Sequence, residues 1–198
     1  TAGNLIFQGN SAGEIRAYRA DTGEQLWSTP AQTGVVAPPI TYTVDGEQYV
    51  AVVAGWGGAF ALAAGGAAEK LKLKSRGRIL AFKLGGIDKL PPIPASAPIP
   101  APPQQHATLE QIADGKVLYH QYCGVCHGPG VKGGGVLPDL RHMQPAKHLA
   151  FKEIVVDGAL KDLGMVGFSD VITEDDAVGI QGYIISEAEK LQTELKRM

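Results

Sequence analysis

The chain has 198 residues, and its 18 basic and 20 acidic side chains give a formal charge of −2. Proteins that bind a phosphate backbone carry a clear basic excess, so this balance argues against a nucleic-acid partner. The longest apolar stretch, residues 50–64, is shorter than the about 20 residues that cross a bilayer and is interrupted by glycines. No membrane span is therefore expected, and no basic segment of a signal peptide opens the chain.

The first part of the chain has the pattern of short strands joined by turns. Residues 14–19 (EIRAYR) alternate polar and apolar side chains, which indicates a half-buried strand. Asp45 and Gly46 form a strong hairpin signal between residues 40–44 and 48–53. Further strands are predicted at residues 4–8, 25–27 and 78–83.

A sequence repeat relates two of these strands, because Gly13–Arg19 matches Gly77–Lys83. Repeated short strands with periodic glycines and aromatics suggest the blades of a β-propeller. A propeller has about four to eight blades, and this stretch has material for fewer than two. Residues 1–86 are therefore expected to be a C-terminal blade portion of a longer polypeptide, since a part-propeller alone exposes unpaired strand edges.

A proline-rich segment, residues 87–105 (IDKLPPIPASAPIPAPPQQ), comes next and holds seven of the 13 prolines. This composition favours extended polyproline II structure and a semi-rigid spacer. A ligand for a proline-binding module is the alternative. The expected organisation is a blade portion over residues 1–86, this linker, and a second domain over residues 106–198.

The second domain contains both cysteines of the chain, Cys123 and Cys126, with His127 directly after them. Cys-x-x-Cys-His is the attachment pattern of c-type haem: two thiols bond the porphyrin and the adjacent histidine binds the iron. Two alternatives remain open. One is a structural zinc site that recruits His142 and His148, and the other is a redox dithiol.

Two helices are predicted around this motif. Thr108 and Gln111 form a capping box that starts a helix leading to Tyr122. Thr173 starts a second helix, whose first turn is acidic. The apolar face of this second helix is expected to consist of Ala177, Ile180, Ile184, Ala188, Leu191 and Leu195.

The sixth ligand of a haem iron has to come from the chain that follows the motif. Met165 is far enough along the chain to reach round the haem, whereas Met143 leaves little chain for that path and Met198 ends the chain. His142 and His148 stay as alternatives. A thioether ligand would raise the reduction potential relative to a second imidazole, which suits an acceptor of electrons from a quinol.

The arrangement of one helix before the motif and one at the end of the domain resembles class I cytochromes c, an all-α fold. In that family a glycine and an aromatic residue of the first helix cross an aromatic residue of the last helix. Gly115, Tyr119 and Tyr183 stand at the matching positions.

The same resemblance implies roles for residues around the haem. His127 and Met165 would be the axial ligands of the iron, since the sequence around Met165 resembles the family's loop before the last helix. Pro138 would accept a hydrogen bond from the ligand histidine through its carbonyl. Arg141 would meet a haem propionate, with a solvated surface charge as the alternative.

The strand region resembles dehydrogenases that use pyrroloquinoline quinone (PQQ). Residues 17–27 (AYRADTGEQLW) resemble the tryptophan-docking motif of that family, in which the Trp lies flat between an Ala and a Gly-containing peptide of a neighbouring blade. Residues 54–60 (AGWGGAF) resemble the glycine-rich segment of the last blade, where backbone approaches the quinone. The resemblance implies PQQ contacts in this segment at Gly58, Ala59, Trp56 and Gly57. A plain glycine-rich turn is the alternative.

Blade portion, linker and cytochrome in this order resemble the end of a PQQ-dependent quinohaemoprotein alcohol dehydrogenase with an eight-bladed propeller. The resemblance implies a periplasmic enzyme in which PQQ, aided by Ca²⁺, oxidises primary alcohols to aldehydes. Electrons would then pass through haem c to an external acceptor, either a small redox protein or a membrane quinone route. The general-base Asp and the calcium ligands are expected in the remainder of the propeller, so this chain alone would only transfer electrons. The rivals are a free-standing electron-transfer cytochrome with a β-rich appendage and a subunit of a membrane complex.

Overall fold

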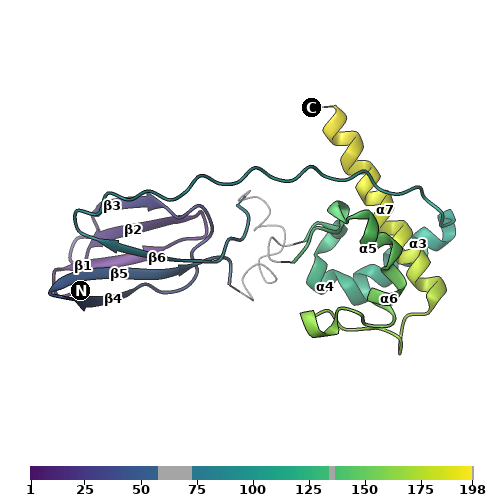
Figure 1. Cartoon of the computed structure of the whole chain (residues 1–198), viewed down its shortest axis with the longest axis horizontal. Helices are drawn as coiled ribbons and strands as arrows, with labels where there is room; N and C mark the ends of the chain where they lie inside the picture. Colours follow the sequence, from purple (N-terminus) through teal and green to yellow (C-terminus); the bar gives the residue numbers. More distant parts are fainter. Residues whose placement is uncertain (58–72, 134–136, 198) are drawn as a thin grey trace. The chain divides into compact units, whose positions relative to one another are not determined.

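The computed structural model describes residues 1–57, 73–133 and 137–197. The chain forms two compact units, Thr1–Ser96 and Ala97–Met198, and each is described by itself (Figure 1). The division falls inside the proline-rich segment. Gly58 and Ala59 lie outside the described residues.

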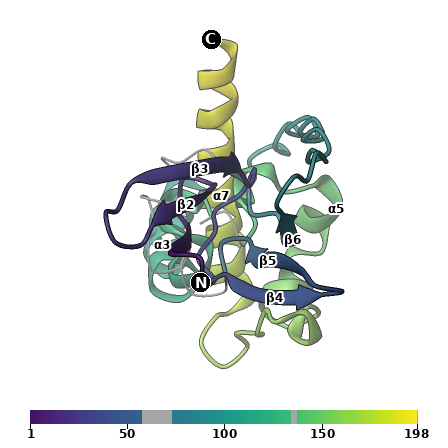
Figure 2. The same ribbon diagram turned by 90° about the vertical axis from the view of Figure 1, so that its left-hand side faces the viewer.

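The N-terminal unit consists of two three-stranded antiparallel sheets (Figures 1 and 2). In order along the chain, one sheet contains β1 (Leu5–Gly9), β2 (Glu14–Arg19) and β3 (Gln25–Pro30), and the other contains β4 (Ile40–Val44), β5 (Glu47–Ala54) and β6 (Arg78–Lys83). All six predicted strands are confirmed. The predicted hairpin is also present, with Asp45 and Gly46 both at positive φ, as a type I′ turn requires. Each sheet has three strands, whereas a propeller blade has about four.

The two sheets of this unit share one apolar core. Ile15 of β2, Val52 of β5 and Leu80 of β6 are buried in it. Trp27 of β3 contacts Phe82 of β6 with ring centroids 5.4 Å apart at 72°. The resemblance led us to expect the indole flat against backbone, but here it meets another ring edge to face, the geometry that aromatic quadrupoles favour.

The two copies of the sequence repeat have different environments. β2 is the central strand of its sheet and buries Ile15 fully, whereas β6 is an edge strand whose matching residue, Ile79, is 77% exposed. The repeat therefore predicts the strand conformation, but not which face turns to the core, since β6 buries the neighbouring Leu80 instead.

The C-terminal unit is helical. Its α-helices are α3 (Leu109–Leu118), α4 (Gly124–His127), α5 (Pro145–Leu149), α6 (Phe151–Val155) and α7 (Glu174–Lys196). A π-helical turn, η1 (Tyr119–Cys123), joins α3 to α4, and the 3₁₀ turns are η2 (Pro129–Val131), η3 (Leu140–His142) and η4 (Lys161–Leu163). Both predicted helices are present and both begin with a complete capping box, at Thr108 and Thr173. Within the described part of the chain, no helix has the length and apolar character to span a membrane.

Burial along α7 differs from the predicted apolar stripe. The stripe is buried as far as Ala188, but Leu191 is half-buried and Leu195 is 42% exposed. Residues 179–185 are instead buried all round the helix. The reason is that α3 packs on one side of α7, while Ala107 and Gln105 of the preceding segment pack at Gly182 on another.

The proline-rich segment has no regular secondary structure, as expected, but it is held at both ends. In the N-terminal unit Leu90 packs against the sheet core, and Gln32 Nε2 donates to the Pro91 carbonyl at 3.1 Å. In the C-terminal unit Gln192 Nε2 donates to the Pro100 carbonyl at 3.2 Å, and Gln105 Nε2 donates to the Gly182 carbonyl at 2.9 Å. Each unit therefore extends along part of the predicted linker.

Candidate haem c site

A cavity of about 290 Å³ lies inside the helical unit, and it brings the predicted iron ligands together with one of the two predicted attachment thiols. Cys123 of η1, His127 of α4 and Met165 from the loop before α7 all line it. The remaining walls are mainly apolar and come from α6 and α7, where Phe151, Ile154, Val155, Ile180 and Ile184 line the cavity.

His127 is oriented by the hydrogen bond that the resemblance implies. Its Nδ1 lies 3.4 Å from the Pro138 carbonyl oxygen. A neutral ring that donates from Nδ1 leaves Nε2 as the nitrogen with a free lone pair, the form that binds a metal. Burial lowers the pKa of His127, while the Pro138 carbonyl acts in the opposite sense, so the ring stays neutral at neutral pH.

The two cysteines differ in their surroundings. Cys123 is buried at the end of the π turn, and desolvation raises the pKa of its thiol to about 11. Cys126, one helical turn later, is exposed. Cys123 therefore lines the cavity, whereas Cys126 is not among its lining residues.

Two methionines line the same cavity, Met165 and Met143. The short distance along the chain argued against Met143, but the turn η3 folds it back to the cavity wall. His142 also lines the cavity, whereas His148 is 8% exposed in α5, with its backbone carbonyl accepting from Gln181 of α7. The cavity wall thus contains both thioethers.

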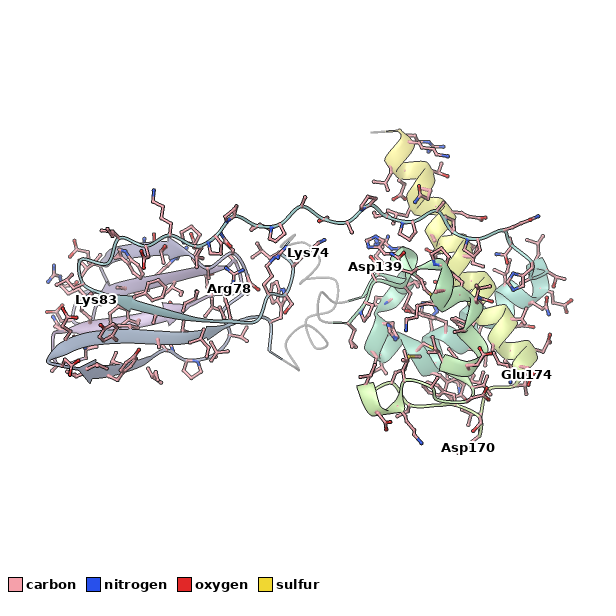
Figure 3. All side chains as sticks on the ribbon, in the orientation of Figure 1. Lys74, Arg78, Lys83, Asp139, Asp170 and Glu174 are labelled. Atoms are coloured by element: carbon pink, nitrogen blue, oxygen red, sulfur yellow. The ribbon has the colours of Figure 1, made fainter. Side chains whose placement is uncertain are left out.

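Arg141 is held by Asp139, which Figure 3 labels in the helical unit. Its Nε and Nη2 donate to the carboxylate at 3.0 and 2.6 Å. Asp139 lines the cavity and also caps η3 by accepting from the Arg141 amide at 3.0 Å. The sequence analysis did not single out Asp139, although an Asp before a short helical turn is a capping signal.

Two of the four residues with an implied PQQ contact lie in the described part of the chain. Trp56 is 1% exposed, and its Nε1 donates to the Leu73 carbonyl at 3.1 Å. Its ring lies against Gly34, where a Cβ would come within 2.9 Å of it. Gly57 has φ near +60°, a conformation that favours glycine. Trp56 is therefore part of the packing of the N-terminal unit itself.

The residues of the cavity fit a covalent haem. They combine thiols for attachment, a neutral imidazole nitrogen, thioether sulfurs and apolar walls, which is the donor set of a c-type site. Cys123 and Cys126 would hold the porphyrin, and His127 with a methionine would bind its iron. The bound group would supply reversible one-electron transfer.

Comparison with protein families divides the chain in the same way. Residues 1–50 match the family described as glucose/ethanol/alcohol dehydrogenase, beta-propeller domain. Residues 110–184 match the family described as cytochrome C oxidase, cbb3-type, subunit III. The second match spans the Cys-x-x-Cys-His motif and the first half of α7.

Individual relatives match almost the whole chain. It is 47% identical to quinohemoprotein alcohol dehydrogenase ADH IIB of Pseudomonas putida, over 94% of this chain and 27% of that protein. It is 40% identical to the dehydrogenase subunit of alcohol dehydrogenase (quinone) of Gluconobacter oxydans, over 95% of this chain and 25% of that protein. The solved structure of quinohemoprotein alcohol dehydrogenase ADHIIG of Pseudomonas putida HK5 is 44% identical and superposes with a TM-score of 0.88, over 98% of this chain and 28% of that one.

The chain thus spans about a quarter of the length of the relatives that it matches. The two sheets correspond to a fragment of a PQQ-type propeller, and the helical unit corresponds to a cytochrome c domain. Taken together, sequence and fold show that this chain corresponds to the C-terminal part of the quinohaemoprotein alcohol dehydrogenases that it matches.

Proposed function

We propose that the helical unit carries covalent haem c and transfers electrons out of a PQQ-dependent alcohol dehydrogenase. In the whole enzyme, PQQ with Ca²⁺ oxidises a primary alcohol to an aldehyde, and the haem passes the electrons on. One observation carries the proposal: Cys123, His127 and Met165 line one apolar cavity, and the His127 ring is oriented by Pro138.

The site residues are assigned as follows. Cys123 and Cys126 form the thioether bonds to haem, and His127 and Met165 are the axial ligands. Arg141, which Asp139 of the cavity wall holds, is assigned to a haem propionate. On the propeller side, PQQ contacts are proposed at Gly58, Ala59, Trp56 and Gly57.

The remainder of the propeller is the partner of the N-terminal unit, and it supplies the general base and the calcium ligands. The blade portion covers residues 1–86 and the linker residues 87–105, followed by the cytochrome domain over residues 106–198. The electron acceptor is external, either a small redox protein or a membrane quinone route. We place the enzyme in the periplasm, because c-type haem is attached there.

A second candidate is a subunit of a membrane-bound complex that reduces quinone. It is favoured by the similarity to the Gluconobacter oxydans protein, which is named as the dehydrogenase subunit of alcohol dehydrogenase (quinone). In that case the haem donates its electrons to a partner subunit rather than to a soluble carrier.

The first experiment is the denatured intact mass of the natively isolated protein. A mass far above the 20.8 kDa of this chain, with one haem retained, supports the dehydrogenase. The same protein should then show reduction of its haem when a primary alcohol is added in the presence of PQQ and Ca²⁺. A mass of 20.8 kDa plus one haem supports a free electron carrier, and the absence of any haem increment contradicts the proposal.

Removal of one cysteine refines this test. Cys126→Ser should retain haem through one thioether bond, with a shifted absorption band of the reduced haem. The double variant of Cys123 and Cys126 should release all haem on denaturation. Retention of haem by the double variant would show that the attachment lies elsewhere.

A further inference from the structure

Gly133 lies where the chain turns back towards the haem-binding histidine. Its amide donates to the His127 carbonyl at 2.7 Å. Pro138 accepts from the ring of His127 at 3.4 Å. Gly133 therefore holds the backbone of His127, and Pro138 holds its side chain.

The structure leaves no room for a side chain at Gly133. A Cβ there would lie 2.7 Å from the Leu137 oxygen, 2.9 Å from the Asp139 nitrogen and 3.0 Å from the Pro138 carbonyl carbon. All three neighbours are backbone atoms, which cannot turn aside as the end of a flexible side chain can. A methyl group would therefore push the peptide that carries the Pro138 carbonyl away.

The other side of this peptide is fixed by an ion pair. The Asp139 carboxylate accepts from the amide of Arg141 and from its guanidinium, at distances of 2.6 to 3.0 Å. Both side chains are less than a fifth exposed, at 19% and 13%, so water screens the pair weakly. The Pro138 carbonyl thus lies between two fixed points, Gly133 and the Asp139–Arg141 pair.

We propose that Gly133 is a positioning residue for the haem ligand. Its missing side chain lets residues 137–139 approach closely enough for the Pro138 oxygen to accept from His127 Nδ1. This inference rests on the proposed haem function. A hydrogen bond at Nδ1 makes the imidazole a more basic ligand, which favours ferric over ferrous iron. Loss of the hydrogen bond should therefore raise the reduction potential.

The chain offers a closely matched control. Gly130 has φ of +64°, against +63° for Gly133, so a substitution by alanine strains the backbone equally at both positions. At Gly130 the nearest atom to a Cβ is the Lys132 Cε at 3.9 Å, which is ordinary contact. Gly133→Ala and Gly130→Ala therefore differ in one respect, the displacement of residues 137–139.

The test uses the full chain with haem attached and two readouts, the midpoint potential and the exchange rate of the His127 Nδ1 proton in the ferrous protein by NMR. Gly133→Ala should disfavour the ferric form relative to the ferrous form by about tenfold. This raises the midpoint potential by about 59 mV, the value of a tenfold change for one electron. It should also speed proton exchange by at least about tenfold. Gly130→Ala should leave both readouts near the wild-type values.

Equal shifts in the two variants, or no shift in Gly133→Ala, would overturn the inference while the haem function stands. A wild-type protein without haem would overturn both. If Gly133→Ala does not fold while Gly130→Ala does, the wild-type protein is measured instead. Slow exchange of its His127 Nδ1 proton supports the contact with Pro138 that Gly133 permits, and exchange as fast as in a free imidazole contradicts it.

Discussion

Gly115 of α3 lies directly against Gly179 of α7, so closely that a Cβ on Gly115 would fall 2.0 Å from the Gly179 carbonyl carbon. One turn further along α3, the rings of Tyr119 and Tyr183 meet edge to face with centroids 5.4 Å apart. The hydroxyl of Tyr119 then donates to the Gly128 carbonyl at 2.8 Å. The helix crossing therefore fixes the residue that directly follows the haem-binding histidine.

Gly115→Ala should destabilise the helical unit, because the added methyl group has only backbone to displace. Overpacking costs about 1–3 kcal/mol, and it opposes the gain of about 1 kcal/mol in helix propensity from Gly to Ala. Denaturant unfolding followed by helical circular dichroism measures the difference. Gly124→Ala is the control, since its nearest neighbour to a Cβ is the Tyr119 oxygen at 3.5 Å. Equal stability of the two variants would contradict the close crossing.

Met165→Ala should remove the sixth iron ligand, whereas Met143→Ala should leave it. Both side chains line the cavity and pack against the same core, so the loss of packing is similar in the two variants. Loss of a thioether ligand lowers the reduction potential and changes the spectrum of the ferric haem. If instead the ferric haem spectrum changes only in Met143→Ala, the sixth ligand is Met143.

Asp176 should make the stability of the helical unit depend on pH. The Thr173 hydroxyl and amide both donate to its carboxylate and lower the pKa of Asp176 below the ordinary value of 3.8. A lowered folded-state pKa stabilises the unit fully above the unfolded-state value, and this contribution is lost as the pH falls through the folded-state value. Wild type should therefore exceed Asp176→Asn in free energy of unfolding near neutral pH but not in strong acid. A difference that is constant with pH would contradict this.

Gln105 should protect the start of the cytochrome domain from hydrogen exchange. Its Oε1 accepts from the amides of His106 and Ala107, each at 3.1 Å, while its Nε2 donates to α7 at Gly182. In Gln105→Ala these two amides should exchange faster, as mass spectrometry or NMR would show. Gln104→Ala, at an exposed neighbouring position, should leave their rates unchanged. Similar acceleration in both variants would point to general fraying of the segment.

Local signals predicted the elements well. The Asp45-Gly46 turn fixes the hairpin, and the capping boxes at Thr108 and Thr173 fix where two helices begin, because these signals act within a few residues. The Cys-x-x-Cys-His motif led to the cavity that Cys123 and His127 line. The family resemblance predicted that Gly115, Tyr119 and Tyr183 lie at the helix crossing, and the structure confirms this.

Other features depend on partners that are distant in sequence. In the sequence, Gly179 looks like an ordinary helix glycine, and only the fold shows that it contacts Gly115. His148 is buried against α7, where Gln181 donates to its carbonyl. No local pattern contains these contacts. The same holds for the proline-rich segment, whose composition predicts its extended form but not the glutamines that bind it.

The π turn at Tyr119–Cys123 has a consequence for the spacing of the haem motif. An α-helix advances by about 100° per residue, and a π turn accommodates one residue more than an α turn. Tyr119 and Cys123 are both buried at its two ends. A segment one residue shorter would continue as a regular α-helix and rotate everything after it by about that angle, turning Cys123 and His127 away from the cavity. Haem attachment in this domain thus depends on the number of residues between the helix crossing and Cys123, as well as on their chemical types.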